Sequence, residues 1–140
     1  MSFLPEEEQE FLSESGIKYE ELTEKMPDGK ERRGVLFTGF SFSGSNLRKA
    51  DGSSPAGVES CDLLLVVPDG YATTKLDSFY TMPRLKRADG KDPQNANTES
   101  ALFGKTWQFW SRHMDDKDWR VGIDGLRTFI SYIRGELRNA

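Results

Sequence analysis

The chain has 140 residues, of which 36% are hydrophobic and 30% charged, a composition typical of one small folded domain. We therefore expect residues 1–140 to form a single domain. Nine Phe, four Tyr and three Trp argue against disorder. One cysteine, Cys61, and one histidine, His113, exclude an internal disulfide, a Cys/His zinc site and a catalytic pair of histidines. We expect no metal and no cofactor.

The charge is unevenly distributed along the chain, whose net charge is −4. Residues 1–30 hold nine acidic and three basic residues, whereas the remaining chain holds fourteen and sixteen. Without an overall basic field we expect no nucleic-acid partner, and without a long apolar run we expect no membrane partner. The N-terminus lacks the basic start and apolar stretch of a signal peptide, so a soluble, reducing, cytoplasmic location is the simplest interpretation.

The first predicted element is a helix that starts at Pro5. Proline has no N–H to leave unpaired in a first helical turn, and the three glutamates that follow oppose the helix dipole. Gly16 is expected to end this helix. Residues 17–25 are a weak strand candidate, and the turn signal at residues 26–29 closes that segment.

Two strands are predicted next. In the strand from Arg33 to Phe42, alternation places one set of side chains on one face and the next set on the other. The residues on one face are Val35, Phe37 and Gly39, and those on the other face are Leu36, Thr38 and Phe40. We expect a loop over residues 44–57. The apolar run from Cys61 to Val67 then predicts a central strand that is covered on both faces.

The second half of the chain predicts a short strand, an irregular segment and a helix. Residues 79–83 form the short strand, and the polar residues 84–100 are expected to be irregular. Near the C-terminus, apolar residues recur at three- and four-residue steps, with Asp124 as cap or first-turn residue. These apolar residues are Ile123, Leu126, Phe129, Ile130, Ile133 and Leu137. The order of elements suggests an α+β domain with an antiparallel meander and flanking helices.

Three motifs over residues 62–138 carry a family resemblance. The apolar strand leads into Pro68-Asp69-Gly70-Tyr71, and Trp-Gln-Phe-Trp-Ser-Arg-His at 107–113 precedes Trp-Arg-Val-Gly-Ile-Asp-Gly-Leu at 119–126. In this order they resemble the ubiquitin-conjugating enzyme (UBC) superfamily, and most of all its bacterial branch called prokaryotic family E. The resemblance implies a UBC-like antiparallel β-meander with an N-terminal and a C-terminal helix, truncated after the helix that follows the active-site segment.

The resemblance also implies partners and a role. That branch is associated with ubiquitin-like proteins, ThiF-type activating enzymes and JAB-type peptidases. The chain would be a carrier in a bacterial conjugation pathway that receives a ubiquitin-like modifier from a ThiF-like activating enzyme, with a JAB-type peptidase in the same pathway. The chain has no Gly-x-x-x-x-Gly-Lys-Ser/Thr element, so we expect a separate enzyme to activate the modifier with ATP.

The predicted nucleophile is a serine. A usual UBC protein has its catalytic cysteine shortly before the tryptophan that precedes the helix, with a supporting His-Pro-Asn motif, and this chain has neither. Ser111 lies eight residues before Trp119, near the place of that cysteine, and His113 falls on the same side of an extended segment. Since serine needs a base, we predict that Ser111 accepts the modifier as an oxyester and that His113 takes its proton. Aspartates within residues 115–118 would orient the imidazole.

Other interpretations stay open. Ser111 and His113 also suit a structural role, in which His113 bonds a backbone carbonyl and shapes the loop. Cys61 is expected to be a buried small hydrophobe, and Trp119 a core residue, whereas Trp107 and Trp110 suit either the core or a partner surface. The alternative function is a catalytically silent UBC-like module that presents a ubiquitin-like protein to another enzyme. A third option is a small α+β domain without a link to conjugation.

Overall fold

The structure is a computed structural model, and it describes residues 2–53, 57–69, 71, 74–121 and 123–140. Within these ranges the helices are α1 (Glu6–Ser15) and α2 (Leu126–Asn139), with a short 3-10 turn η1 (Asp116–Asp118) between β8 and α2. The strands are β1 (Glu20–Lys25), β2 (Glu31–Ser41), β3 (Arg48–Lys49), β4 (Ser60–Val67), β5 (Phe79–Met82), β6 (Leu85–Lys86), β7 (Thr98–Leu102) and β8 (Lys105–Trp110). In the part of the chain that the structure describes, no helix has the length and apolar content needed to cross a membrane.

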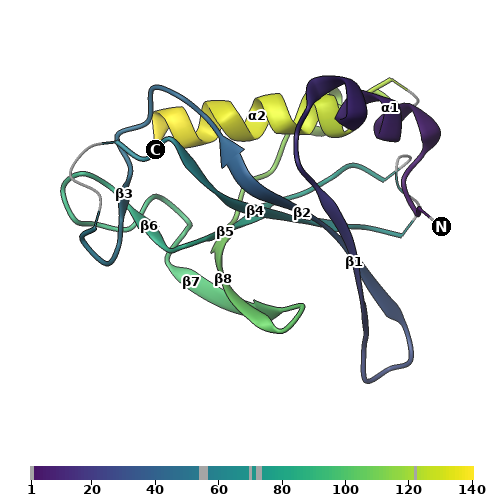
Figure 1. The fold of residues 1–140 in the computed structure, drawn as a ribbon, viewed down its shortest axis with the longest axis horizontal. Coiled ribbons are helices and arrows are strands. Elements are labelled where there is room, and N and C mark those ends of the chain that lie inside the picture. Colours follow the sequence, from purple (N-terminus) through teal and green to yellow (C-terminus); the bar gives the residue numbers. More distant parts are fainter. Residues whose placement is uncertain (1, 54–56, 70, 72–73, 122) are drawn as a thin grey trace.

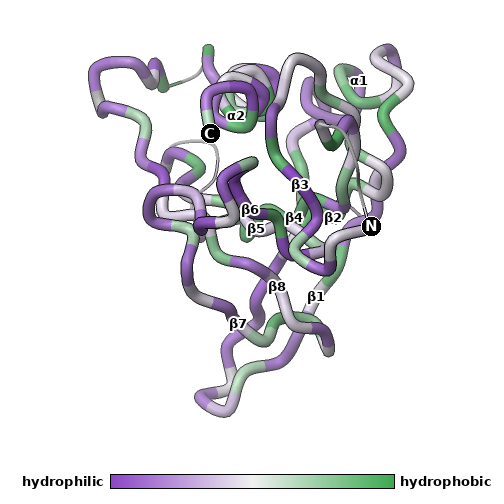
Figure 2. Tube along the Cα trace, turned by 90° about the vertical axis from the view of Figure 1, so that its left-hand side faces the viewer, coloured by the Kyte–Doolittle hydropathy of each residue, from purple (hydrophilic) through white to green (hydrophobic). Residues whose placement is uncertain are grey.

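The described strands form one large antiparallel sheet and one small ladder. The six strands of the sheet follow the order β1-β2-β4-β5-β8-β7, and β3 pairs with β6 separately. Both helices lie on one side of the sheet (Figure 1). A view at right angles shows the β7–β8 hairpin extending away from the helices (Figure 2). The predicted α+β arrangement, a meander with an N-terminal and a C-terminal helix, is confirmed.

Apolar side chains pack on both faces of the sheet. Between sheet and helices, Leu63 and Leu65 of β4 belong to the same core cluster as Phe129 and Ile133 of α2. On the opposite face, Leu64 packs with two side chains of the β7–β8 hairpin, Leu102 and Trp107. Strand β4 is therefore buried on both faces, as its continuous apolar run predicts.

A bulge in β2 changes one predicted face. Val35 and Phe37 are buried as expected, but the register with β4 shifts between Phe37 and Phe40. Gly39 has a φ of 66°, which the bulge requires and which glycine adopts without a steric penalty. The extra residue moves Phe40 to the face of Phe37, where the two ring centroids are 6.2 Å apart. The prediction that Phe40 lies on the other face is therefore wrong.

The expectation of an irregular segment at residues 84–100 is wrong in part. Strand β6 lies within this segment, and β7 begins there and pairs with β8 from Thr98–Phe109 to Leu102–Lys105. Because β7 is an edge strand with mostly exposed side chains, its polar sequence carries no buried alternating pattern. The predicted loop at 44–57 likewise contains β3, which pairs with β6.

The helix ends agree with prediction for α1 and differ for α2. Helix α1 begins after Pro5 and ends at Gly16, whose φ of 71° makes it a left-handed C-cap. Helix α2 begins only at Leu126, so Asp124 precedes the helix and is not its cap. Ile123, predicted to face the core from this helix, precedes it and is 69% exposed.

The N-terminus of α2 is capped by a residue of α1. The carboxylate of Glu8 accepts hydrogen bonds from the backbone N–H of Leu126, at 3.1 and 3.2 Å, and from the hydroxyl of Tyr71. Glu8 is consequently buried, although the neighbouring Glu7 is exposed. Glu8, one of the acidic residues that outnumber the basic ones in residues 1–30, thus links α1 to α2.

Candidate active site

The segment that follows β8 carries the predicted site residues and is anchored on both sides. The backbone N–H of Ser111 donates to the carbonyl of Asn95 at 2.9 Å. The carbonyl of Arg112 accepts from the N–H of Ser78 at 2.8 Å. Ser111 therefore sits between the loop that precedes β7 and the turn that precedes β5.

The end of β8 is fixed by its last tryptophan. Trp110 stacks on Phe79 with ring centroids 5.3 Å apart, and its indole N–H donates to Thr81 Oγ1 at 2.8 Å. The guanidinium of Arg112 lies over the same indole, 5.1 Å from the ring centroid. Since these contacts are made inside the sheet core, the residue after Trp110 starts from a defined position.

The structure brings Ser111 and His113 together. Ser111 Oγ lies 3.3 Å from His113 Nε2, as their spacing in an extended segment predicts. His113 Nδ1 lies 2.6 Å from Asp77 Oδ1. A proton on Nδ1 that is donated to Asp77 satisfies this contact, and in that tautomer Nε2 can accept from the Ser111 hydroxyl. In space, the side chains are arranged as in a Ser–His–Asp triad, with the imidazole between the hydroxyl and the carboxylate.

The carboxylate that bonds His113 is not one of those predicted. Asp115 accepts from the backbone N–H of Lys117 within its own turn, and the side chain of Asp116 lies outside the described residues. Asp77 stands 36 positions before His113 and reaches it because β5 pairs with β8, Phe79 opposite Trp110. Sequence reasoning missed Asp77, and the pairing of the two strands is the signal that would have found it.

The triad is open to solvent. The His113 side chain is 63% exposed and that of Asp77 is 47% exposed, while Ser111 is half-buried. A large partner molecule can therefore reach the serine without any rearrangement of the core.

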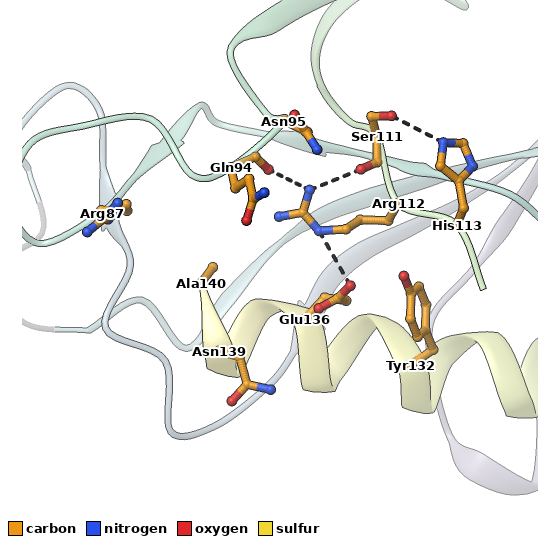
Figure 3. Close-up of a pocket in the computed structure, with 10 residues that line it drawn as sticks. All are labelled: Arg87, Gln94, Asn95, Ser111, Arg112, His113, Tyr132, Glu136, Asn139 and Ala140. Carbon is orange, nitrogen blue, oxygen red and sulfur yellow. Dashed lines mark hydrogen bonds and ion pairs between the residues drawn. The ribbon is translucent and has the colours of Figure 1, made fainter. Parts of the chain in front are cut away.

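Ser111 and His113 line a surface groove of about 600 Å³. Its other walls come from the loop with Gln94 and Asn95 and from the C-terminal half of α2 (Figure 3). Arg112 braces these walls, since it donates to the carbonyls of Gln94 at 2.6 Å and Ser111 at 3.1 Å and lies 3.5 Å from Glu136. The groove is thus polar on both sides.

Tyr132 points from α2 toward the segment with Arg112 and His113 (Figure 3). Burial, assisted by a hydrogen bond to Glu136 and the charge of that carboxylate, raises the pKa of Tyr132 to about 12. Its phenol stays protonated at neutral pH and is a neutral hydrogen-bonding group in the groove. Among the described residues, no group of three or more His, Cys, Asp or Glu side chains is arranged to hold a metal ion.

Cys61 and the tryptophans have structural positions. Burial raises the pKa of the Cys61 thiol to about 12, with the charge of Asp62 as a smaller cause, so the thiol stays protonated at neutral pH. Trp107 and Trp110, left open between core and partner surface, are 1% and 0% exposed and belong to the core, and Trp119 is buried as expected.

Of three comparisons with known proteins, one returned a match. A search of curated proteins and a search of solved structures each returned no match. A family model, described as prokaryotic E2 family E, matches residues 4–140. The match covers the meander, both helices and the segment with Ser111 and His113. This chain belongs to the prokaryotic E2 family E.

Proposed function

We propose that this chain is a carrier in a bacterial ubiquitin-like conjugation pathway and that it accepts the modifier on Ser111 as an oxyester. Membership of an E2-like family indicates a ubiquitin-conjugating-like role and, with it, a ubiquitin-like partner protein. The observation that supports the serine is the triad, in which Ser111 Oγ, His113 and Asp77 are linked at 3.3 and 2.6 Å.

The proposed transfer begins with a separate ThiF-like enzyme that activates the C-terminal carboxyl group of the modifier with ATP. Ser111 Oγ attacks the activated carbonyl carbon, and His113 Nε2 takes the hydroxyl proton. The bond between that carbon and the activating group then breaks, and the activating group leaves with the electron pair and takes the proton from His113. Asp77 stabilises the imidazolium that forms. An amine of the target then attacks the oxyester carbon and gives a proton to His113. The bond between Ser111 Oγ and the carbonyl carbon breaks, and Ser111 Oγ takes that proton from His113. In such a pathway a JAB-type peptidase would release the modifier.

The groove supports this use of the serine. The C-terminal tail of a modifier is an extended peptide, and the amides of Gln94, Asn95 and Asn139 can bond its backbone. The loop of Asn95 is held against Ser111 by the backbone hydrogen bond of 2.9 Å. We assign to the Asn95 side chain the donor that meets the negative oxygen formed during attack.

The test is an adduct assay with a ubiquitin-like protein and a ThiF-like enzyme from the same genome, with ATP. Wild type should form an adduct that survives thiol reductant, which cleaves a thioester, and that is cleaved by hydroxylamine, which leaves an amide intact. Ser111→Ala should form none. Ser131→Ala, at an exposed position on α2, and Cys61→Ala should behave like wild type. Adduct formation by Ser111→Ala, or loss of the wild-type adduct in reductant, would refute the serine assignment.

A second candidate, the catalytically silent module, is favoured by one observation. The chain's only cysteine is buried on β4, so the usual thioester chemistry has no accessible thiol. This module would bind the ubiquitin-like protein stoichiometrically and present it to another enzyme. Binding by wild type without any ATP-dependent adduct, and with equal affinity in Ser111→Ala, would favour it over the carrier.

A further inference from the structure

We propose that this protein, on its own, hydrolyses small activated carboxylic esters, with peptide esters as the preferred substrate class. The proposal rests on the Ser111 assignment of the proposed function, but it needs no modifier, no activating enzyme and no ATP. It follows from three features of the described residues: the pre-arranged triad, its access to water, and the polar groove beside it.

Hydrogen bonds on both sides of Asp77 hold the triad in place. Ser78 bonds Arg112 through the backbone at 2.8 Å, and Lys75 Nζ donates to the Met114 carbonyl at 2.5 Å. The segment 75–78 is therefore fastened to residues 112–114 at two points, with Asp77 on one segment and His113 on the other between them. Such fastening keeps the carboxylate against the imidazole before any substrate arrives.

Water has direct access to the site. More than half of the His113 side chain and nearly half of that of Asp77 are exposed. A small acyl group on Ser111, which does not fill the groove as the tail of a modifier would, therefore meets water beside the His113 imidazole. The open site is thus suited to complete hydrolysis of a small ester as well as to acylation of the serine.

The reaction has two balanced steps. In the first, the Ser111 O–H bond breaks, its proton passes to His113 Nε2, the Oγ–carbonyl bond forms, and the ester alcohol leaves with that proton. In the second, His113 takes a proton from water while the water oxygen attacks the acyl carbon. Ser111 Oγ then leaves, regains the proton, and the carboxylic acid is released. The sum is ester and water giving acid and alcohol.

The lining of the groove selects the acyl group. Gln94, Asn95, Tyr132 and Asn139 offer hydrogen bonds, and Ala140 is the one aliphatic side chain among its described lining residues. An amide-containing acyl group can pair with these donors and acceptors, whereas a long alkyl chain would leave them unpaired. A peptide ester is therefore the better substrate.

The test follows p-nitrophenolate release from the purified full chain with no partner protein. The substrates are the p-nitrophenyl esters of N-acetylglycine and of octanoic acid. Wild type should turn over the glycine ester about tenfold faster or more, in kcat/KM, than the octanoate ester. Ser111→Ala should fall to the buffer rate. Asp77→Asn should lower kcat by about tenfold or more with KM little changed, because Asp77 positions the base and does not bind the ester.

The matched control is Asp115→Asn, which removes an exposed carboxylate from the same segment without touching His113, and it should keep the wild-type rate. Circular dichroism confirms that each variant is folded.

Hydrolysis that persists in Ser111→Ala, or equal rates for Asp77→Asn and Asp115→Asn, would overturn the proposal, and faster octanoate turnover would overturn its substrate class. If wild type forms the modifier adduct but hydrolyses no ester, only this inference fails. Ester hydrolysis through Ser111 without any adduct would instead refute the carrier.

Discussion

At the scale of single residues, the proposed transfer depends on the contact between Asp77 and His113, because this contact sets which ring nitrogen can act as the base for Ser111. With the carboxylate at 2.6 Å from Nδ1, the tautomer that satisfies this contact has its proton on Nδ1, and Nε2 can then accept. An asparagine at position 77 has an amide that can donate to Nδ1, which would put the ring proton on Nε2, facing Ser111. The shape of the site would be kept, while Nε2 could no longer accept the Ser111 proton as the proposed transfer requires.

Asp124 makes a pH-dependent contribution to stability that can be measured. Hydrogen bonds from the Arg120 side chain and backbone, and then from Thr128, lower the pKa of Asp124 from 3.8 to about 2. A lowered pKa in the folded state contributes stability that is full above the unfolded-state pKa and is lost as pH falls through the folded-state value. Asp124→Asn should therefore be less stable than wild type above pH 3.8, and this difference should shrink between pH 3.8 and about 2.

Urea unfolding of both proteins across this pH range measures the difference in the free energy of unfolding. A difference that stays constant down to pH 2 would mean that the Asp124 carboxylate is not the group that titrates.

At the scale of elements, one side chain of β8 links two neighbouring segments of backbone to the central sheet. The buried amide of Gln108 donates to the carbonyls of Leu85 and Ala96, both at 2.9 Å, and accepts from Leu85 N–H at 2.8 Å and Thr81 Oγ1 at 3.2 Å. It thereby holds β6 and the turn with Ala96, which adjoins Asn95, against the central sheet.

Gln108→Leu should lower the free energy of unfolding by about 2–4 kcal/mol, because several buried backbone groups lose their partner. The exposed Gln94→Leu is the control and should change it by less than about 0.5 kcal/mol. Urea denaturation measures both. Equal stability of the two variants would show that the Gln108 network does not hold these elements.

The two helices are joined by Glu8. Because its carboxylate accepts from Leu126 N–H at the start of α2, Glu8→Ala should lower the free energy of unfolding by about 1–2 kcal/mol. Glu7→Ala, one position earlier on the exposed face of α1, should have little effect. Thermal unfolding compares them, and equal melting temperatures would contradict the capping role.

At the scale of the whole molecule, the sequence determines the elements whose patterns are local. The Pro5 and Gly16 signals predict α1, and the apolar run at 61–67 predicts the central strand, because each depends only on neighbouring residues. The meeting of Ser111 and His113 is predictable for the same reason. The face of Phe40 is not, because a bulge reverses the alternation.

Long-range features escape prediction from the sequence for a physical reason. Strand β7 is stabilised by pairing with β8 at the sheet edge, and its own polar residues carry little signal. Asp77 reaches His113 only through the pairing of β5 with β8, and Glu8 reaches α2 across 118 positions. The position of Asp77 in the triad therefore depends on the fold, and no local sequence motif predicts it.

The central claim is that Ser111 carries the acyl group, and mass spectrometry of the modifier adduct tests it most directly. Digestion with trypsin yields the peptide 106–112, in which Ser111 is the only serine. The account predicts that the C-terminal residues of the modifier are attached to this peptide through the Ser111 oxygen. Attachment at Cys61 or at a lysine, with an unmodified 106–112 peptide, would contradict it.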